Sequence, residues 1–436
     1  MKYWERGALR VSENRKYLKN GDTPFFWLGD TAWLLLQQSS GEDARIYLKN
    51  RADKGFNVIQ AVLINSLPGE EANSLTAVNC DVTNAKFWKH CDEVISIAED
   101  LGIYMGLLPS WGSIVKYGML NTGNAAQYAD FLYQRYKDRP NIIWILGGDI
   151  LGTDGLDFYR EFGRLLKEKM PDKLIAYHPF GRTASSMWFQ QDEWLDINMF
   201  QSGHRRYDQP ALGRWDDNSA KEEFFGEDNW KYVDRDLRCV PVKPTLDGEP
   251  SYEQILQGLH DPSQPYWQAW DVRRYAYWSV FQGAAGHTYG DNAIQQFYTG
   301  EQPGKYGVKE TWRESIHHEG SCHMKHLKDL MTSVDFTAGR PAEELLLSGQ
   351  GKMYDRISVF AGENFIFCYD YMGKEFTLDL TGYAGKRLYA YWLDPVSGVY
   401  SYLGDMTGKK AVTVKPVTRF SGHNDWVLVL RKYIPK

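Results

Sequence analysis

The chain has 436 residues and a formal net charge of −6, from 50 basic and 56 acidic side chains. Proteins that bind nucleic acids or anionic membranes need a concentrated basic surface, and this sequence has no run rich in lysine and arginine. No apolar stretch reaches the roughly 18 residues that are needed to span a bilayer. We therefore expect a soluble protein with no nucleic-acid partner and no membrane span, and the length favours two domains.

The amino terminus, MKYWERGALRVSENRK, lacks the apolar core of a secretory signal. The localisation is therefore open: the protein is periplasmic or secreted if a signal has been removed, and cytoplasmic otherwise. Five cysteines, including Cys80, are widely spaced and odd in number, which argues against a disulfide framework. We interpret them as buried thiols.

Apolar runs alternate with amphipathic stretches along the first 335 residues. The predicted strands are 24–33, 56–64, 103–112, 141–149, 173–180, 195–204, 243–249 and 284–291. Helical spacing is clear at 42–55, 86–102, 124–138 and 155–169. A charged, tryptophan-containing insertion at 205–240 separates the sixth and seventh strands, and we expect it above the strand ends.

This alternation predicts an α/β fold, a (β/α)8 TIM barrel in residues 1–335, because its strands are covered outside and packed within. A doubly wound sheet is the alternative, but LGDTAW after the first strand lacks the GxGxxG fingerprint of dinucleotide-binding folds. From residue 336 to 436 the pattern changes to short alternating segments between Gly, Asp and Asn turns. This part predicts a small C-terminal β-sandwich domain.

Two of the predicted strands end on an acid. Glu249 closes KPTLDGE, and Asp149 closes IWILGGD after two glycines that allow a close backbone approach. Pro250 has no N–H and helps to end its strand. In a TIM barrel the chemistry lies at the carboxyl ends of the strands. We therefore expect the two carboxylates, from strands four and seven, to face each other across the barrel mouth.

A facing pair of carboxyl groups is what cleavage of a glycosidic bond requires. One acid protonates the leaving oxygen, while the other attacks the anomeric carbon or activates water. An acid at a random position is more often a surface group or a helix cap, but the placement of Asp149 and Glu249 favours catalysis. Asp247 shares the strand face of Glu249, and we rank it as a supporting residue. Retention and inversion remain alternatives, which the carboxyl separation distinguishes.

Three segments, YLKNGDTPFFWLGDTAW, IIWILGGD and LDGEPSYE, resemble those of the apiosidase-like glycoside hydrolases, glycoside hydrolase family 140. Members of this family pair a clan A type barrel with a small C-terminal β domain described as collagen-binding-like. The resemblance spans nearly the whole chain and implies that Asp149 is the general acid/base and Glu249 the nucleophile. Clan A barrels usually place Glu after Asn at the strand-four position, so Asp149 departs from that pattern.

The resemblance implies a retaining exo-glycosidase that acts on plant cell-wall glycan. Its sharpest form is a β-apiosidase on pectic side chains of the rhamnogalacturonan II type, and a glycosidase of the same fold with another terminal sugar is the alternative. A non-catalytic carbohydrate- or matrix-binding protein is a further alternative, although such a protein has no reason to keep an acid pair at two strand ends.

Aromatic rings that stack on sugars, with polar groups for the hydroxyls, are expected at the barrel mouth. The chain has 16 Trp and 28 Tyr, most of which we expect in the core. The candidates for substrate binding are the polar and aromatic residues at or just after strand ends: Asp30, Trp33, Trp111, His178, His204, Tyr252, Glu253, Tyr289 and Asp291.

One cluster, HHEGSCHMKH at 317–326, favours a different chemistry at first sight. Helical spacing would place His318, Cys322 and His326 on one face, as in a metal site. The segment does not match HExxH, and it follows the eighth strand, away from the strand ends. We interpret it as a solvated helix face, and we expect no metal and no cofactor. The expected partner is an oligosaccharide or polysaccharide substrate of a monomeric protein.

Overall fold

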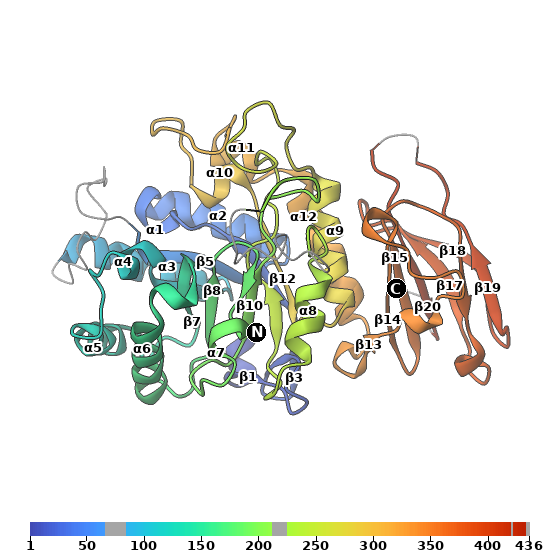
Figure 1. Cartoon of the computed structure of the whole chain (residues 1–436), viewed down its shortest axis with the longest axis horizontal. Helices are drawn as coiled ribbons and strands as arrows, with labels where there is room; N and C mark the ends of the chain where they lie inside the picture. Colours follow the sequence, from blue (N-terminus) through green and yellow to red (C-terminus); the bar gives the residue numbers. More distant parts are fainter. Residues whose placement is uncertain (66–83, 212–224, 420–421, 433–436) are drawn as a thin grey trace.

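In the part of the chain that the computed structural model describes, residues 1–65, 84–211, 225–419 and 422–432, eight parallel strands form a barrel that precedes an antiparallel β domain (Figure 1). The barrel strands are β4 (Trp27–Thr31), β5 (Val58–Ile64), β6 (Tyr104–Ser110), β7 (Ile142–Ile150), β8 (Ile175–Pro179), β10 (Asn198–Gln201), β11 (Thr245–Asp247) and β12 (Gly286–Gly290). The barrel closes between β8 and β10 through a parallel bridge from Ala176 to Ile197. The predicted TIM barrel is confirmed.

Helices surround this barrel in the expected alternation. They are α1 (Leu35–Gln38), α2 (Gly41–Asp53), α3 (Ala85–Asp100), α4 (Gly112–Lys116), α5 (Ala125–Tyr136), α6 (Leu156–Lys169), α7 (Ser186–Phe189), α8 (Trp230–Leu237), α9 (Ala269–Phe281), α10 (Asn292–Gln295), α11 (Trp312–Ser315) and α12 (Glu319–Thr332). Side-chain caps fix where some of them begin: Ser40 accepts from the Asp43 N–H at the start of α2, and Asn84 accepts from the Phe87 N–H at the start of α3.

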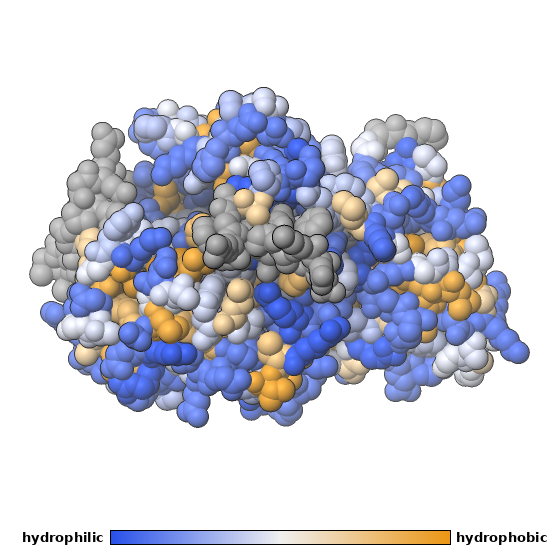
Figure 2. All heavy atoms as spheres, in the orientation of Figure 1, coloured by the Kyte–Doolittle hydropathy of each residue, from blue (hydrophilic) through white to orange (hydrophobic). Residues whose placement is uncertain are grey.

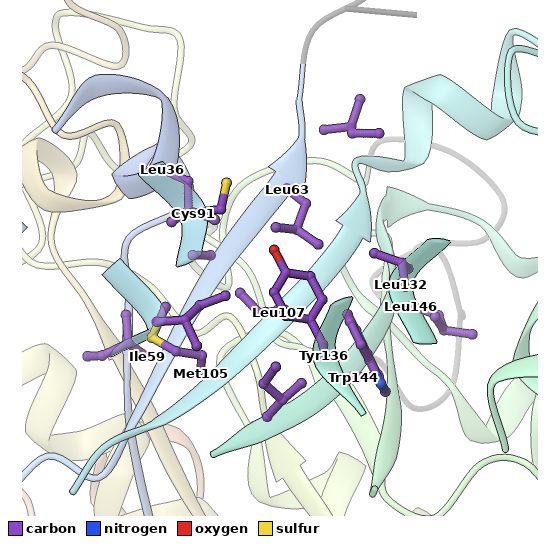
Figure 3. Packing of buried hydrophobic residues seen from close by; sticks show 14 of the residues in the cluster. Leu36, Ile59, Leu63, Cys91, Met105, Leu107, Leu132, Tyr136, Trp144 and Leu146 are labelled. Carbon is purple, nitrogen blue, oxygen red and sulfur yellow. The ribbon is translucent and has the colours of Figure 1, made fainter. Parts of the chain in front are cut away.

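Alternate residues of each barrel strand face opposite ways. On β5, Ile59 and Leu63 point outward and pack with Met105, Leu107 and residues of the surrounding helices (Figure 3). Their neighbours on the strand, together with residues of the other strands, fill the barrel interior, and all of β5 and β6 is buried. This double burial explains why these strands appear in the sequence as nearly continuous apolar runs.

Two predicted elements differ at their ends. The predicted strand 24–33 is divided: β3 (Thr23–Phe25) pairs with β2 (Leu18–Asn20) and β1 (Leu9–Val11) in a small antiparallel sheet, and β4 alone enters the barrel. The predicted strand 243–249 is shortened to β11, so Glu249 lies two residues beyond the strand. A further short strand, β9 (Thr183–Ala184), pairs antiparallel with β10.

The C-terminal part forms an antiparallel sheet in the order β13 (Arg340–Pro341), β14 (Ile357–Gly362), β15 (Phe365–Asp370), β20 (Trp426–Arg431), β17 (Tyr389–Leu393) and β18 (Tyr400–Asp405). A smaller sheet, β16 (Phe376–Asp379) with β19 (Ala411–Val414), shares the hydrophobic core of one of its faces. The other face packs on α9 and α12 of the barrel, as Figure 1 shows from the side. The C-terminal β domain is confirmed, while its boundary at residue 336 stays a prediction.

Buried ion pairs join the two parts. Arg273 of α9 donates from two nitrogens to Asp425, at 2.9 and 2.7 Å, and both side chains are almost fully buried. Nearby, Glu227 accepts from Arg274 of α9 at 2.5 Å and from Tyr354 of the β domain at 2.7 Å. Each charge is therefore compensated within the junction, as burial requires.

Polar and charged side chains predominate on the face drawn in Figure 2, where apolar residues form small separate groups. No helix among the described residues is long and apolar enough to cross a membrane. The four described cysteines are free thiols, but the interpretation of buried thiols is wrong for two of them: Cys322 is exposed and Cys239 half-buried, whereas Cys91 and Cys368 are buried. Cys80 lies outside the described residues, as do positions 212–224 of the predicted insertion.

Candidate active site

A bulge in β7 brings Asp149 to the barrel mouth. The register to β8 shifts between Gly147 and Ile150, so two residues have no partner on the neighbouring strand. Gly147 has φ of +92°, and a Cβ there would lie 2.2 Å from the carbonyl oxygen of His178. Glycine is therefore required for the close approach of β7 and β8. Asp149 itself has φ of +47°, a left-handed conformation that a short polar side chain tolerates.

Glu249 is held by backbone hydrogen bonds on both sides instead of by a strand. The Gly248 N–H donates to the Phe200 carbonyl at 2.9 Å, and the Gly203 N–H donates to the Glu249 carbonyl at 3.1 Å. Both bonds join this loop to β10 and the residues after it. Glu249 is only 5% exposed. Its carboxylate is therefore fixed in direction although β11 has already ended.

The two carboxylates meet as expected. An oxygen of Asp149, an oxygen of Glu249 and a ring nitrogen of His178 all lie within 4.8 Å of one another. Asp149 opens onto solvent in the pocket, whereas Glu249 and His178 are buried behind it. One acid of the pair, Asp149, is therefore accessible from the open side of the pocket, and the other, Glu249, lies at its base.

Two histidines contact the Glu249 carboxylate. His204 Nε2 lies 2.9 Å from Oε1, and the Tyr252 N–H donates to His204 Nδ1 at 3.4 Å. Because Nδ1 accepts, we assign the proton to Nε2, which then donates to Glu249. His178 Nε2 lies 3.2 Å from Oε2, but without the alignment of a hydrogen bond. The His204 bond is therefore the directional contact that orients the carboxylate.

The surroundings drive the two acids to opposite protonation states. Although Asp149 opens onto the pocket, the surrounding protein removes part of the water from its carboxyl group and so raises its pKa, and the negative charge of Glu249 raises it further, to about 7. Burial also acts to raise the pKa of Glu249, but His178 and His204 outweigh it and bring this pKa down to about 2. Between these values Asp149 carries a proton and Glu249 a charge.

A pocket of about 150 Å³ surrounds the acids. Of the residues proposed from the sequence, Trp33, Trp111, His204 and Tyr252 line it with Asp149 and Glu249. The Trp33 indole N–H donates to the Tyr252 hydroxyl at 3.2 Å, and its ring meets Trp111 edge-on at 5.3 Å. His178 lies directly beneath, with its ring 5.1 Å from that of Trp33. Aromatic rings thus form one wall above the acid pair.

Several pocket residues were missed from the sequence. The polar and aromatic side chains that the structure adds include Arg182, Gln201, Gln295 and Tyr306. Gln201 is the last residue of β10, so the strand-end rule would have found it. Arg182 and Tyr306 lie in loops with positive φ, and no spacing in the sequence marks them. The charges of Asp149 and Glu249 both act on the Tyr306 hydroxyl, which places it near the pair.

Five of the proposed residues do not line this pocket: His178 lies beside the acid pair, and the other four form a buried network behind it. Asp30 is fully buried, where Arg51 and Tyr47 donate to its carboxylate. Tyr289 donates to Glu253 at 2.6 Å. The remaining member is Asp291, which caps α10 and pairs with His318 at 2.6 Å. These side chains have protein partners in place of a substrate, because the outward-facing residues of strand ends point to the helices.

Asp247 lies beside the pocket, and its supporting role stays a prediction. It is fully buried and accepts from the Ser202 hydroxyl at 2.6 Å and from Asn229 at 3.0 Å. Burial raises its pKa to about 7, against the effect of these hydrogen bonds. Asp247 therefore joins β11 to the loop after β10 and to the start of α8, and it does not line the pocket.

The residues of the acid pair are also the candidates for a metal site. Among the described residues, Asp149, His178 and Glu249 are the group whose donor atoms come close enough to hold an ion. His204 already donates to one Glu249 oxygen, so the set offers few open donors to an ion. The segment at 317–326 does not gather its donors: His318 bonds Asp291, and Cys322 is exposed. The expectation of no metal stays a prediction.

Comparison with known proteins adds independent findings. A family model described as an apiosidase-like catalytic domain matches residues 12–338, and one described as a collagen-binding domain of a collagenase matches residues 341–431. A solved structure described as a glycoside hydrolase is 38% identical over 99% of this chain and 98% of its own, with a TM-score of 0.91. A glycoside hydrolase family 5 protein from Bacteroides vulgatus is 36% identical over 99% of this chain and 95% of its own, with a TM-score of 0.91.

A more distant structure shares the fold alone. The glycoside hydrolase family 5 mannosidase from Rhizomucor miehei is 12% identical over 76% of this chain and 100% of its own, with a TM-score of 0.51. No protein with a curated description matches the sequence.

Proposed function

The chain belongs to the apiosidase-like glycoside hydrolases, and from this premise we propose that it removes a terminal sugar from a plant cell-wall glycan with retention of configuration. The observation that carries the proposal is the separation of the acids, whose oxygens approach within 4.8 Å. Retaining enzymes hold their carboxyl groups about 5 to 5.5 Å apart, and inverting ones about 6.5 to 9.5 Å apart to admit a water. The closest oxygens of Asp149 and Glu249 lie within 4.8 Å, which is compatible with the shorter separation and supports direct attack.

In the first step, an ionised Glu249 oxygen attacks the anomeric carbon while Asp149 gives its proton to the glycosidic oxygen. The bond to the leaving group breaks, and an ester between the sugar and Glu249 forms. The opposite pKa shifts of the two acids support these roles. The hydrogen bond from His204 orients the attacking carboxylate.

In the second step, the ionised Asp149 takes a proton from water. The water oxygen displaces Glu249 from the anomeric carbon, and the sugar leaves with its original configuration. Water reaches the exposed Asp149 from the open side of the pocket, and Glu249 returns to its ionised state on the buried side.

The size of the pocket supports cleavage of one terminal sugar at a time. Pockets for drug-sized ligands usually measure about 300 to 1,000 Å³. The described residues enclose about 150 Å³ around the acids, which suits a single sugar ring. The ring of Trp111, half-buried at the edge, offers a surface for that sugar.

The sharpest form of the proposal is β-apiosidase activity on pectic side chains of the rhamnogalacturonan II type. The family match supports this sugar, and a different terminal sugar on the same scaffold is the alternative. The test is to incubate the protein with separate pectic fractions and to identify the released monosaccharides, with Glu249→Gln as the inactive control. We expect apiose from the wild type alone. Release of another sugar would select the alternative, and no release from any glycan would favour a binding protein.

A further inference from the structure

A second and larger cavity lies where the β domain meets α12. It measures about 790 Å³ and shares no lining residue with the pocket of the acid pair. Its walls come from the C-terminal half of α12 and from the ends of the strands at one side of the β domain, including His326, Ser333, Phe365, Leu393, Tyr400 and Arg431. We call this cavity the junction groove.

The junction groove is far from the chemistry. The N-terminal turn of α12 lies near the active site, because the Gly320 N–H donates to Glu253 beside Tyr252. Ser333, at the other end of this helix, lines the groove. The 14 residues of α12 span about 20 Å at 1.5 Å per residue. A ligand in the groove would therefore not occupy the catalytic pocket.

Tyrosines cover the sheet face beside the groove. The register pairs Tyr391 with Tyr402, Leu393 with Tyr400, and Tyr389 with Arg431, so these side chains share one face of β17, β18 and β20. Strands β14 and β15 bury this face against the barrel, but β18 has largely exposed side chains, and Tyr402 is 61% exposed. The result is an aromatic surface that continues out of the groove, on the side of the β domain marked by β17 and β18 in Figure 1.

Arg431 lies in the middle of this surface without an acid. Its guanidinium lies 5.4 Å from the centre of the Tyr400 ring and donates to the Ser333 hydroxyl at 2.9 Å. Its Nε is buried and has no hydrogen-bond partner, and among the described residues no carboxylate lies within ion-pair distance. By contrast, Arg273 and Arg356 at the same domain junction each pair with a carboxylate. A partly buried cation without a counter-charge is a place for an anionic ligand.

Two of the acids at the edge of the groove have cationic partners, and the third has neutral hydrogen-bond donors. Asp329 pairs with Lys325, Glu363 lies 3.6 Å from Lys386, and Asp335 accepts from the Thr337 N–H and hydroxyl. Lys432 adds a second positive charge to the lining. Asp335 keeps its negative charge, whereas Arg431 is a cation of the lining that has no acid partner among the described residues.

We propose that the junction groove binds an acidic oligosaccharide, whose sugar rings lie against Tyr400 and Tyr402 and whose carboxylate pairs with Arg431. Tyrosine rings present flat apolar faces with a polar edge, and a guanidinium binds a carboxylate through two parallel hydrogen bonds. The volume falls within the range of ordinary ligand pockets, which often form between domains. This inference rests on the proposed action on glycans, and it adds an anchor for acidic polymer that lies apart from the catalytic pocket.

Affinity electrophoresis tests the proposal, with full-length protein migrating through gels that contain polygalacturonate or, for comparison, a neutral galactan. We expect polygalacturonate to retard the wild type. Tyr402→Ala and Arg431→Gln should each weaken this binding about tenfold, the loss expected for one stacking contact or one charged hydrogen bond. Tyr117→Ala is the matched control, because Tyr117 is 68% exposed on the barrel and away from the groove. Turnover of a small aryl glycoside should be equal in all four proteins.

The proposal fails if polygalacturonate does not retard the wild type, or if both groove variants migrate as the wild type does. Equal retardation by neutral galactan would remove Arg431 from the recognition of the ligand and would also contradict it. Tyr402 is exposed, so its variant is expected to fold even if Arg431→Gln does not. Retardation that persists in a protein that releases no sugar would refute the proposed hydrolysis and leave the groove site standing.

Discussion

Replacing Glu249 by Gln should lower the pKa of Asp149, because the charge of Glu249 is one of the two causes that raise it to about 7. Two charges 4.8 Å apart interact by about 3.5 kcal/mol at an effective dielectric constant of 20. This energy equals about 2.5 pKa units. Asp149 is open to solvent, which screens the charge, so we expect a shift of about 1 to 2 units, to between about 5 and 6.

The shift can be measured by carbon NMR of protein labelled at the aspartate carboxyl groups, with Asp149→Asn to assign the signal. Glu249→Gln preserves shape, and unchanged thermal unfolding would confirm an intact fold. A matching effect is expected in wild-type kinetics: kcat/KM should fall about tenfold per pH unit above about 7, as Asp149 loses the proton that it must donate. A pKa that stays near 7 in Glu249→Gln would show that the two acids are not coupled and would refute the reasoning.

Three further substitutions test the wall of the pocket, the hydrogen bond to Glu249 and the junction between the two domains. Trp111→Ala should raise KM about tenfold or more with little loss of stability, because a half-buried ring at the mouth of the pocket contacts sugar more than core. His204→Ala should raise the pKa of Glu249 by about 1 to 2 units, since a hydrogen bond to a charged group contributes about 1.5 to 3 kcal/mol, and the acid limb of the kcat/KM profile should move upward with it. Asp425→Ala should lower the free energy of unfolding by about 3 to 5 kcal/mol, because Arg273 remains buried without its partner.

The controls separate these effects from general damage. Tyr117→Ala removes an exposed ring elsewhere, and Asp405→Ala removes an exposed acid of the β domain, so both should behave as the wild type. A large loss of stability with unchanged kinetics would assign Trp111 to packing. An acid limb that does not move in His204→Ala would leave His178 as the group that sets the ionisation of Glu249. A change in unfolding below about 1 kcal/mol for Asp425→Ala would argue against a tight junction.

The sequence pattern predicted the barrel because its strands are buried on both faces and therefore appear as apolar runs. The regular alternation of these runs with helical segments then indicated the order of the strands. It was less accurate where strands are short. The segment 243–249 has the composition of a strand, but only Thr245–Asp247 pair in the sheet, and Glu249 is fixed by bonds to the loop after β10. These backbone hydrogen bonds join residues that are 46 and 48 positions apart in the sequence, so the local spacing of apolar residues does not predict them.

The strand-end rule found the site only in part, for a physical reason. Residues at strand ends point alternately into the mouth and toward the helices, and the sequence does not say which. Trp111 and His204 point inward, whereas Asp30 meets Arg51 of α2, which lies 21 positions along the chain. Loop residues such as Tyr306 reach the pocket through turns that no strand pattern marks. The structure was needed to separate a residue that lines the pocket from one in a buried ion pair.

The central claim, a double displacement with Asp149 as acid/base and Glu249 as nucleophile, is tested most directly with Asp149→Asn. General acid catalysis contributes roughly 10²- to 10⁴-fold, mainly for poor leaving groups. The variant should therefore lose natural glycan cleavage but still react with an aryl glycoside of an acidic phenol, and the intermediate should accumulate as a burst. Azide needs no deprotonation, so it should restore turnover and give a sugar azide of retained configuration. Equal loss on both substrates with no azide product, or an azide of inverted configuration, would contradict the account.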